Sequence, residues 1–75
     1  MRILQKSQMI DFMRFLADVD VLLLLMITPE NEQMKQAVDL FNELNPDMKI
    51  TMKEAEFITS HFYYDSNGFI TCDEI

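Results

Sequence analysis

Residues 21–27 form an unbroken run of seven apolar side chains, and this run limits what the chain can fold into. It is much shorter than the ~20 residues that a helix needs to cross a bilayer, so we do not expect a membrane span. A helix that is apolar all round must be covered on every side. We therefore expect residues 19–27 to form either a central core helix or a subunit interface.

We favour the subunit interface because the chain has only 75 residues. A domain of this size buries only about 60% of the surface that its unfolded chain exposes, and many such chains gain stability from a second subunit. The sequence therefore predicts a homodimer. The residues expected at its interface are Val21, Leu22, Leu24 and Leu25.

The scarcity of turn-forming residues favours an all-α fold. The chain contains one Gly and two Pro, whereas all-β folds need such residues at their many tight turns. Apolar residues make up 49% of the chain, which is too many for a disordered protein. Cys72 is the single cysteine, so no intrachain disulfide is possible. We expect one domain over residues 1–75, with three helices and a short C-terminal turn or strand.

The first helix is expected to run from residue 3 or 8 to residue 26. Its apolar residues recur at helical spacing: Met9, Phe12, Met13, Leu16, Val19, Leu23 and Ile27. On the opposite side, Arg14 and Asp18 are spaced to form an i,i+4 pair. Asp20 points toward the apolar side, so it either needs a partner or marks a break in the helix.

The second helix is expected to start near Thr28, which can cap it, with Pro29 in the first helical position. Its acidic first turn, with Glu30 and Glu32, complements the positive end of the helix dipole. Its apolar stripe consists of Met34, Ala37, Val38, Phe41 and Leu44. The sequence Asn45-Pro46-Asp47 then ends it.

The third helix begins with a capping box formed by Thr51 and Glu54. Its buried side consists of Ala55, Ile58 and Phe62. Phe57 and His61 share another face of the helix. We expect these two to pack under the first helix of the partner subunit, or else to form a second contact surface. Residues 65–68 predict a turn, and residues 69–71 a short extended segment.

Residues 62–75 read F-Y-Y-D-S-N-G-F-I-T-C-D-E-I and resemble an EF-hand calcium loop with its incoming helix. The resemblance implies that Gly68 makes the sharp turn and Ile70 the small β-bridge. The ligands that it implies are Asp65, Asn67, the Phe69 carbonyl, Thr71 and Glu74. Tyr63 stands where the first carboxylate would be. A plain Asn-Gly turn without any cofactor is therefore the main interpretation, and a calcium-responsive module is the alternative.

The net charge of -7 is unevenly placed along the chain. Residues 1–27 hold equal numbers of basic and acidic side chains, so the whole excess lies in residues 28–75. Such a surface repels nucleic acid and anionic membranes and is attracted to basic surfaces. We therefore expect no direct binding to nucleic acid or membrane, and a larger basic protein as the partner.

Three carboxylates on one side of the second helix are the main candidates for contact with this partner. At about 100° per residue, Glu32, Asp39 and Glu43 fall within about 40° of each other. We expect no lysine at i,i+4 spacing to neutralise them. Glu54 and Glu56 of the third helix add to the same half. An array of fixed carboxylates can imitate a phosphate backbone and occupy a DNA-binding surface.

In size, charge and lack of catalytic parts, the chain is similar to the small host-takeover proteins of bacteriophages. Some of these are DNA mimics that fill a DNA channel, such as that of the sliding clamp. The resemblance implies a protein that inhibits or modulates a nucleic-acid-binding protein by occupying its basic surface. Aromatic side chains tend to supply the central contact energy of an interface, and we expect Phe57, Tyr63 and Tyr64 to do so.

The residues do not favour an enzyme. The chain has one His, one Cys and no Gly-rich phosphate loop, and we expect His61 to be a surface or packing residue. A structural assembly subunit without inhibitory activity is a further alternative. No signal-peptide pattern is present, so the expected location is the cytoplasm, that of the host if a bacteriophage encodes the chain.

Overall fold

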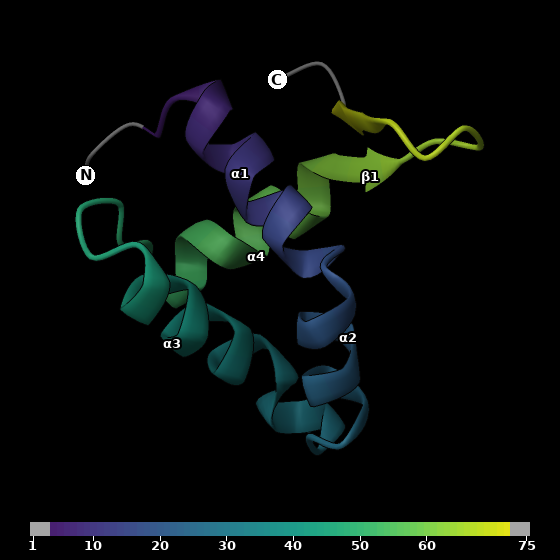
Figure 1. The fold of residues 1–75 in the computed structure, drawn as a ribbon. Helices are drawn as coiled ribbons and strands as arrows, with labels where there is room; N and C mark the ends of the chain where they lie inside the picture. Colours follow the sequence, from purple (N-terminus) through teal and green to yellow (C-terminus); the bar gives the residue numbers. More distant parts are fainter. Residues whose placement is uncertain (1–3, 73–75) are drawn as a thin grey trace.

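The computed structural model describes residues 4–72 as a mostly helical unit with one β-hairpin (Figure 1). Its helices are α1 (Lys6–Leu16), α2 (Val19–Met26), the 3-10 turn η1 (Glu30–Glu32), α3 (Gln33–Leu44) and α4 (Met52–His61). The strands β1 (Phe62–Tyr64) and β2 (Ile70–Cys72) pair antiparallel. The helical character is confirmed, but the three expected helices are four α-helices in the described part of the chain. None of them has the length and apolar character needed to cross a lipid bilayer.

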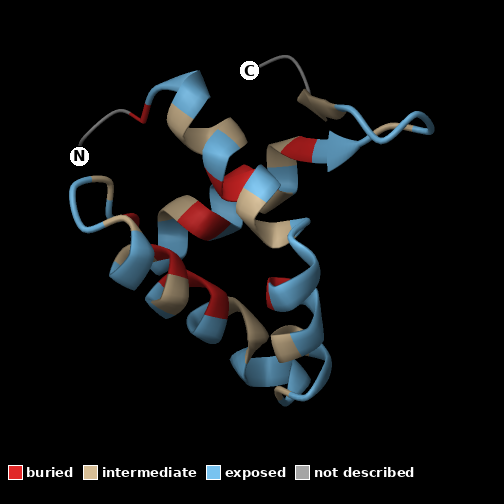
Figure 2. Cartoon of the chain, in the orientation of Figure 1, coloured by how far each residue is buried: buried red, intermediate tan, exposed pale blue. Residues whose placement is uncertain are grey.

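The core lies where α1, α3 and α4 meet (Figures 1 and 2). Phe12 of α1 and Ile58 of α4 are fully buried, and the Phe12 ring meets the edge of the Phe41 ring at a centroid distance of 5.2 Å. The remaining buried members of this cluster are Leu4, Met13, Val38, Ile50, Ala55 and Phe62. No residue of α2 belongs to it, so the interpretation of residues 19–27 as a central core helix is wrong.

The expected first helix is two helices because Asp18 begins a new one. Asp18 has extended backbone angles, and its side-chain Oδ1 accepts hydrogen bonds from the backbone N–H groups of Asp20 at 2.9 Å and Val21 at 3.4 Å. A carboxylate in this position satisfies amides that have no partner inside the helix. The break therefore falls two residues before Asp20, which lies exposed in the first turn of α2.

Thr28 and Pro29 do not start the next α-helix as expected. The Thr28 hydroxyl donates back to the Leu24 carbonyl at 2.7 Å, and Pro29 precedes the η1 turn. The side-chain amide of Gln33 donates to the carbonyls of Leu25 at 2.9 Å and Thr28 at 3.3 Å. These bonds satisfy the C-terminal carbonyls of α2 and fasten that end to the start of α3.

The apolar stripe expected on the second helix is confirmed in its centre and wrong at its end. Ala37, Val38 and Phe41 are buried, and Met34 is half-buried, whereas Leu44 is 63% exposed. Leu44 lies in the last turn of α3, beyond the part of α3 that contributes to the core cluster. Helical phase alone therefore does not bury a residue at the end of a helix.

The expected capping box of α4 is present. The Thr51 hydroxyl accepts from the Glu54 N–H at 3.1 Å, and the Glu54 carboxylate accepts from the Thr51 N–H at 2.9 Å. Ala55, Ile58 and Phe62 are buried as expected. Phe62 already belongs to β1, so the chain passes directly from α4 into the hairpin.

Asn42 holds the segment between α3 and α4 in place. Its side-chain amide donates to the Ile50 carbonyl at 2.9 Å, and its Oδ1 accepts from the Ile50 N–H at 2.8 Å. Both backbone groups of a buried residue thus depend on one side chain. Unpaired buried polar groups are costly because they lose their water without gaining a partner.

We expect Asn42→Ala to lower the free energy of unfolding by about 1–3 kcal/mol, since it leaves the Ile50 amide and carbonyl without these partners. Urea denaturation followed by circular dichroism measures the effect. The matched control is Asn31→Ala at an exposed position of η1, expected to stay within about 0.5 kcal/mol. Equal stability of both variants would contradict the role assigned to Asn42.

Candidate functional site

The acidic row on α3 is partly neutralised. Glu32, Asp39 and Glu43 are all exposed, but Lys35 Nζ lies 2.7 Å from Asp39 Oδ2 in an i,i+4 ion pair. The expectation that no lysine neutralises this row is therefore wrong. The hydrogen bond and charge of Asp39, with a smaller contribution from Glu32, raise the pKa of Lys35 above 10.5. Of the three carboxylates, Glu43 is the one least affected by this lysine.

The two acidic candidates on α4 have different roles. Glu54 is half-buried, and its carboxylate belongs to the capping box, so part of its hydrogen-bonding capacity serves the helix. Glu56 is exposed beside Phe57, which is also exposed. The Phe57 ring contacts the His61 ring at a tilt of 44°, with ring centroids 4.4 Å apart, and the packing of this pair under a second subunit remains a prediction.

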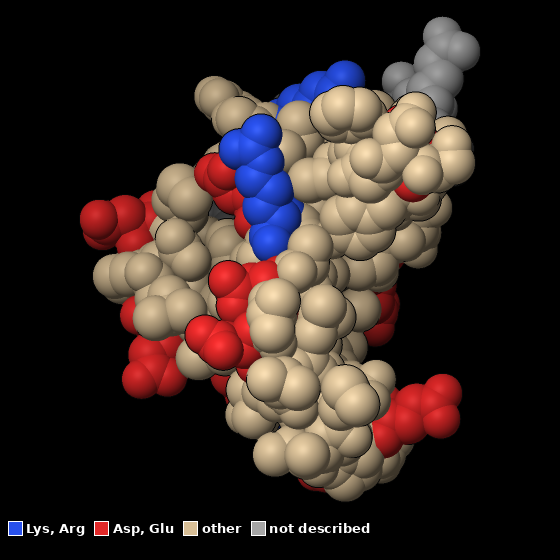
Figure 3. Space-filling view, turned by 45° about the vertical axis from the view of Figure 1, so that its right-hand side comes forward, with Lys and Arg blue, Asp and Glu red and all other residues tan. Residues whose placement is uncertain are grey.

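The acidic side chains are spread over the face of the molecule that Figure 3 shows. Figure 3 shows them on the left, near the centre and at the lower right of one face, with uncharged surface between them. On this face they do not merge into one continuous patch. Any partner that contacts them must therefore also contact the uncharged surface between them.

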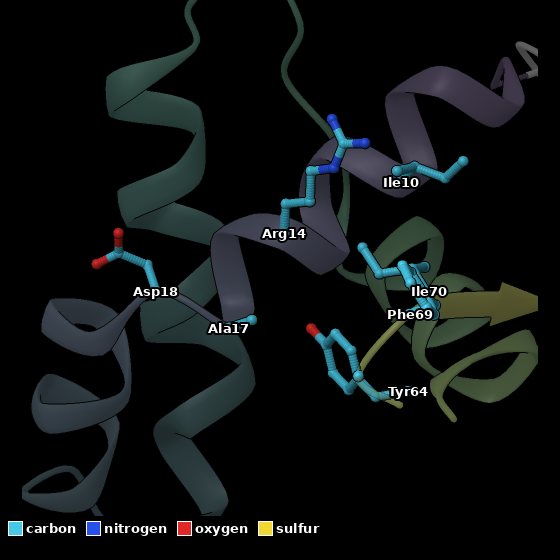
Figure 4. A pocket seen from close by; sticks show the side chains of 8 residues that line it. Ile10, Arg14, Ala17, Asp18, Tyr64, Phe69 and Ile70 are labelled. Atoms are coloured by element: carbon cyan, nitrogen blue, oxygen red, sulfur yellow. The ribbon is translucent and has the colours of Figure 1, made fainter. Parts of the chain in front are cut away.

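Tyr63 and Tyr64 point to opposite faces of the hairpin, as neighbours on a strand do. Tyr63 is 48% exposed. The Tyr64 hydroxyl donates to the Met13 carbonyl, which ties the hairpin to α1 (Figure 4), and burial raises the pKa of Tyr64 above 10.0. Tyr63 is thus available to a partner, whereas Tyr64 already has a structural contact.

The expected dimer-interface residues do not share one side of α2. Val21 is buried, Leu24 and Leu25 are half-buried, and Leu22 is exposed. The apolar side chains that α2 exposes, together with its C-cap residue, are Val19, Leu22, Leu23, Met26 and Ile27. We call this set the α2 face. Four of its members lie outside the predicted interface set, because the apolar run does not show which of its sides contacts α3.

Two open hollows flank the end of α1. One, of about 480 Å³, lies between α1 and the hairpin and is lined by apolar side chains including Ile10 and Phe69 (Figure 4). The other, of about 550 Å³, lies between α1, α2 and α3. Its lining combines apolar residues with the carboxylates of Asp11, Asp18 and Asp20.

Arg14 lines both hollows, but it does not form the pair expected with Asp18. Its guanidinium points away from the Asp18 carboxylate (Figure 4). The reason is the start of α2, since the Asp18 carboxylate is turned toward backbone amides of that helix.

The turn between the two strands uses the Asp65 carboxylate internally. Its Oδ1 accepts from the N–H groups of Asn67 at 2.9 Å and Phe69 at 3.0 Å, and Gly68 has a positive φ of 82°. Within residues 4–72, no group of three or more His, Cys, Asp or Glu side chains is placed to hold a metal ion. Glu74 lies outside the described residues, and calcium binding by Asp65, Asn67, Thr71 and Glu74 remains a prediction.

The backbone before this turn differs from that of the resembled family. An EF-hand-like loop would follow directly on a helix, whereas α4 ends at His61 and Phe62–Tyr64 is strand β1. Cys72 is half-buried against the core in β2, which agrees with an apolar packing role.

No family model, curated protein or solved structure matches this chain.

We expect Tyr64 to ionise above pH 10.0 in the folded protein. Because the fold favours the neutral phenol, the stability that Tyr64 contributes is complete below its unfolded pKa. It is lost as the pH rises through the raised folded pKa. Absorbance titration of Tyr63→Phe, which leaves Tyr64 as the single tyrosine, gives its midpoint.

The same variant unfolded in urea is the control and should titrate at the ordinary value of a tyrosine. A folded-state midpoint at or below the unfolded one would contradict the partial burial of Tyr64 in the folded protein.

Proposed function

We propose that this protein is a non-enzymatic acidic binding protein that inhibits or modulates a nucleic-acid-binding protein by occupying its basic surface. The observation that carries the proposal is the exposure of Glu32, Glu43 and Glu56, on η1, α3 and α4 respectively, in a chain of net charge -7. Carboxylates held on helices keep a constant spacing. They can therefore take positions that phosphates of DNA would occupy on the partner.

The ion pair on α3 changes which carboxylates matter for this function. Asp39 already has a cation beside it, and Glu54 accepts a backbone amide at the start of α4. Long-range attraction to a basic partner therefore depends more on Glu32, Glu43 and Glu56 than on these two. Uncompensated charge raises the rate of encounter with an oppositely charged surface, and added salt weakens this effect.

Exposed aromatic side chains on α4 and β1 support a docked complex. Phe57 follows Glu56 in α4, and Tyr63 lies in the adjoining strand, both exposed. Rigid aromatic rings lose little conformational entropy on binding and often contribute most of the contact energy. A basic partner could then be attracted by the carboxylates and held by these rings. The proposal includes a cytoplasmic location, where nucleic-acid-binding proteins are available.

Affinity capture from a bacterial lysate, with and without competing duplex DNA, tests the proposal. We expect the captured proteins to include DNA-binding proteins, and duplex DNA to displace them. The combined change Glu32→Lys, Glu43→Lys and Glu56→Lys should abolish capture, because like charges would then face each other. The helical circular dichroism signal should remain, since all three positions are exposed.

The matched control exchanges the charges of the α3 ion pair, Lys35→Asp with Asp39→Lys, which keeps the net charge unchanged. We expect this variant to retain capture. Undiminished capture by the triple variant, or capture that duplex DNA leaves unaffected, would rule out the proposed DNA-like mode of binding.

A further inference from the structure

The α2 face is a continuous apolar surface that no part of residues 4–72 covers. Val19, Leu22, Leu23 and Met26 follow i, i+3, i+4, i+7 spacing and therefore lie on one side of the helix. Met26 is 78% exposed, and Ile27, which extends this side at the C-cap, is 81% exposed. Single exposed apolar residues are common, but a contiguous group of them marks an interaction site. The spacing is that of a helix that inserts into a groove of its partner.

This face is presented by a helix anchored at both ends. Asp18 caps its N-terminus, and Gln33 holds its C-terminal carbonyls. On the opposite side, Val21 is buried and lines the hollow shared with Leu40 and Phe41 of α3. A preformed helix does not have to be ordered during binding, which lowers the entropic cost of docking.

The charged residues that flank α2 in the sequence are all negative, although Arg14 of α1 lines the same hollow as Asp18 and Asp20. Residues 15–34 contain no Lys, Arg or His, and their four charged residues are Asp18, Asp20, Glu30 and Glu32. The first two lie at the N-terminus of α2, and the other two follow its C-terminus in η1. All four are exposed. Figure 3, in which the right-hand side of Figure 1 comes forward, shows an uncharged lower region with acidic side chains on both sides.

A second copy of this chain is a poor occupant of the α2 face. α2 is only about 12 Å long at 1.5 Å per residue. If two copies docked antiparallel through α2, the N-terminal Asp20 of one copy would therefore approach Glu30, beyond the C-terminus of α2, in the other. Parallel docking would set Asp18 and Asp20 against their own counterparts. Charges closer than the Debye length of about 8 Å are little screened at physiological salt. Both arrangements therefore oppose self-association.

We propose that the α2 face docks into an apolar groove on a larger protein, with Lys or Arg side chains at both ends of the groove. The apolar side chains would fill the groove, and the acidic ends of α2 would meet the cations. This inference rests on the proposed function only in that the protein acts by binding another protein. It assigns the main apolar contact to α2 rather than to Phe57 and Tyr63.

A synthetic amphipathic peptide with leucines on one side and lysines along both edges is a suitable probe. Titrating it into the ¹⁵N-labelled protein should shift the backbone amides of residues 18–32. We expect Leu23→Glu with Met26→Glu to weaken binding by about tenfold or more, as loss of central apolar contacts does. Asp20→Asn with Glu30→Gln should weaken it by about two- to fivefold per residue, as loss of exposed ion pairs does.

The matched control is Glu43→Gln with Glu56→Gln, which removes the same amount of charge from α3 and α4. It should leave the affinity for the peptide unchanged. A second control peptide with glutamates in place of the lysines should not bind. Circular dichroism checks that each variant folds. Lost binding is assigned to the missing contact only where the helical signal is retained.

Three results would overturn the inference. The peptide could instead shift backbone amides centred on α3 and α4, and these shifts could disappear in the variant Glu43→Gln with Glu56→Gln. That result would overturn the inference while agreeing with the proposed function. Equal binding of the glutamate peptide would refute the charge complementarity. A dimer in sedimentation velocity that Leu23→Glu with Met26→Glu dissociates would identify a second copy as the occupant. Capture insensitive to DNA would contradict the proposed function alone, since the peptide titration does not involve DNA.

Discussion

The hydrogen bonds that the Asp18 carboxylate accepts from the first amides of α2 determine how the rest of the molecule is arranged. They end one helix and begin another. α1 can then cross α4 within the core, while α2 turns toward α3 and covers only part of it (Figure 1). A continuous helix would keep both segments on one axis. The break thus separates residues that build the core from residues that remain available on the surface.

The consequences for binding follow from this separation. The core cluster around Phe12, Phe41 and Ile58 contains no residue of α2. Only Val21 of α2 is buried, so the opposite, exposed side of this helix is available for binding. Its neighbours in sequence are acidic at both ends. The carboxylates on α3 and α4 extend the negative charge to other sides of the molecule, where Lys35 reduces it locally. Apolar contact and electrostatic attraction are therefore supplied by different elements.

Several features could be predicted because they depend on residues close together in sequence. The capping box needs only Thr51 and Glu54 at the right spacing. The buried side of α4 follows from helical phase, and the Asp65–Gly68 turn from residues that favour it. Lys35 and Asp39 are also i,i+4 neighbours, so their ion pair could have been read from the sequence and was missed. The ends of the helices were harder to predict, because Asp18 and Thr28 can each stand inside a helix or cap one.

By itself, the sequence determined a small acidic helical chain with a turn near its C-terminal end. It also determined that the apolar run at residues 21–27 needs to be covered. Short-range spacing, composition and charge are sufficient for these conclusions. Only the tertiary structure decided that α2 stands outside the core cluster, and that Met26 and Val19, not Val21 and Leu24, are its most exposed apolar positions. The physical reason is that exposure depends on which side of a helix meets its neighbours. An almost uniformly apolar run does not encode that side in its own periodicity.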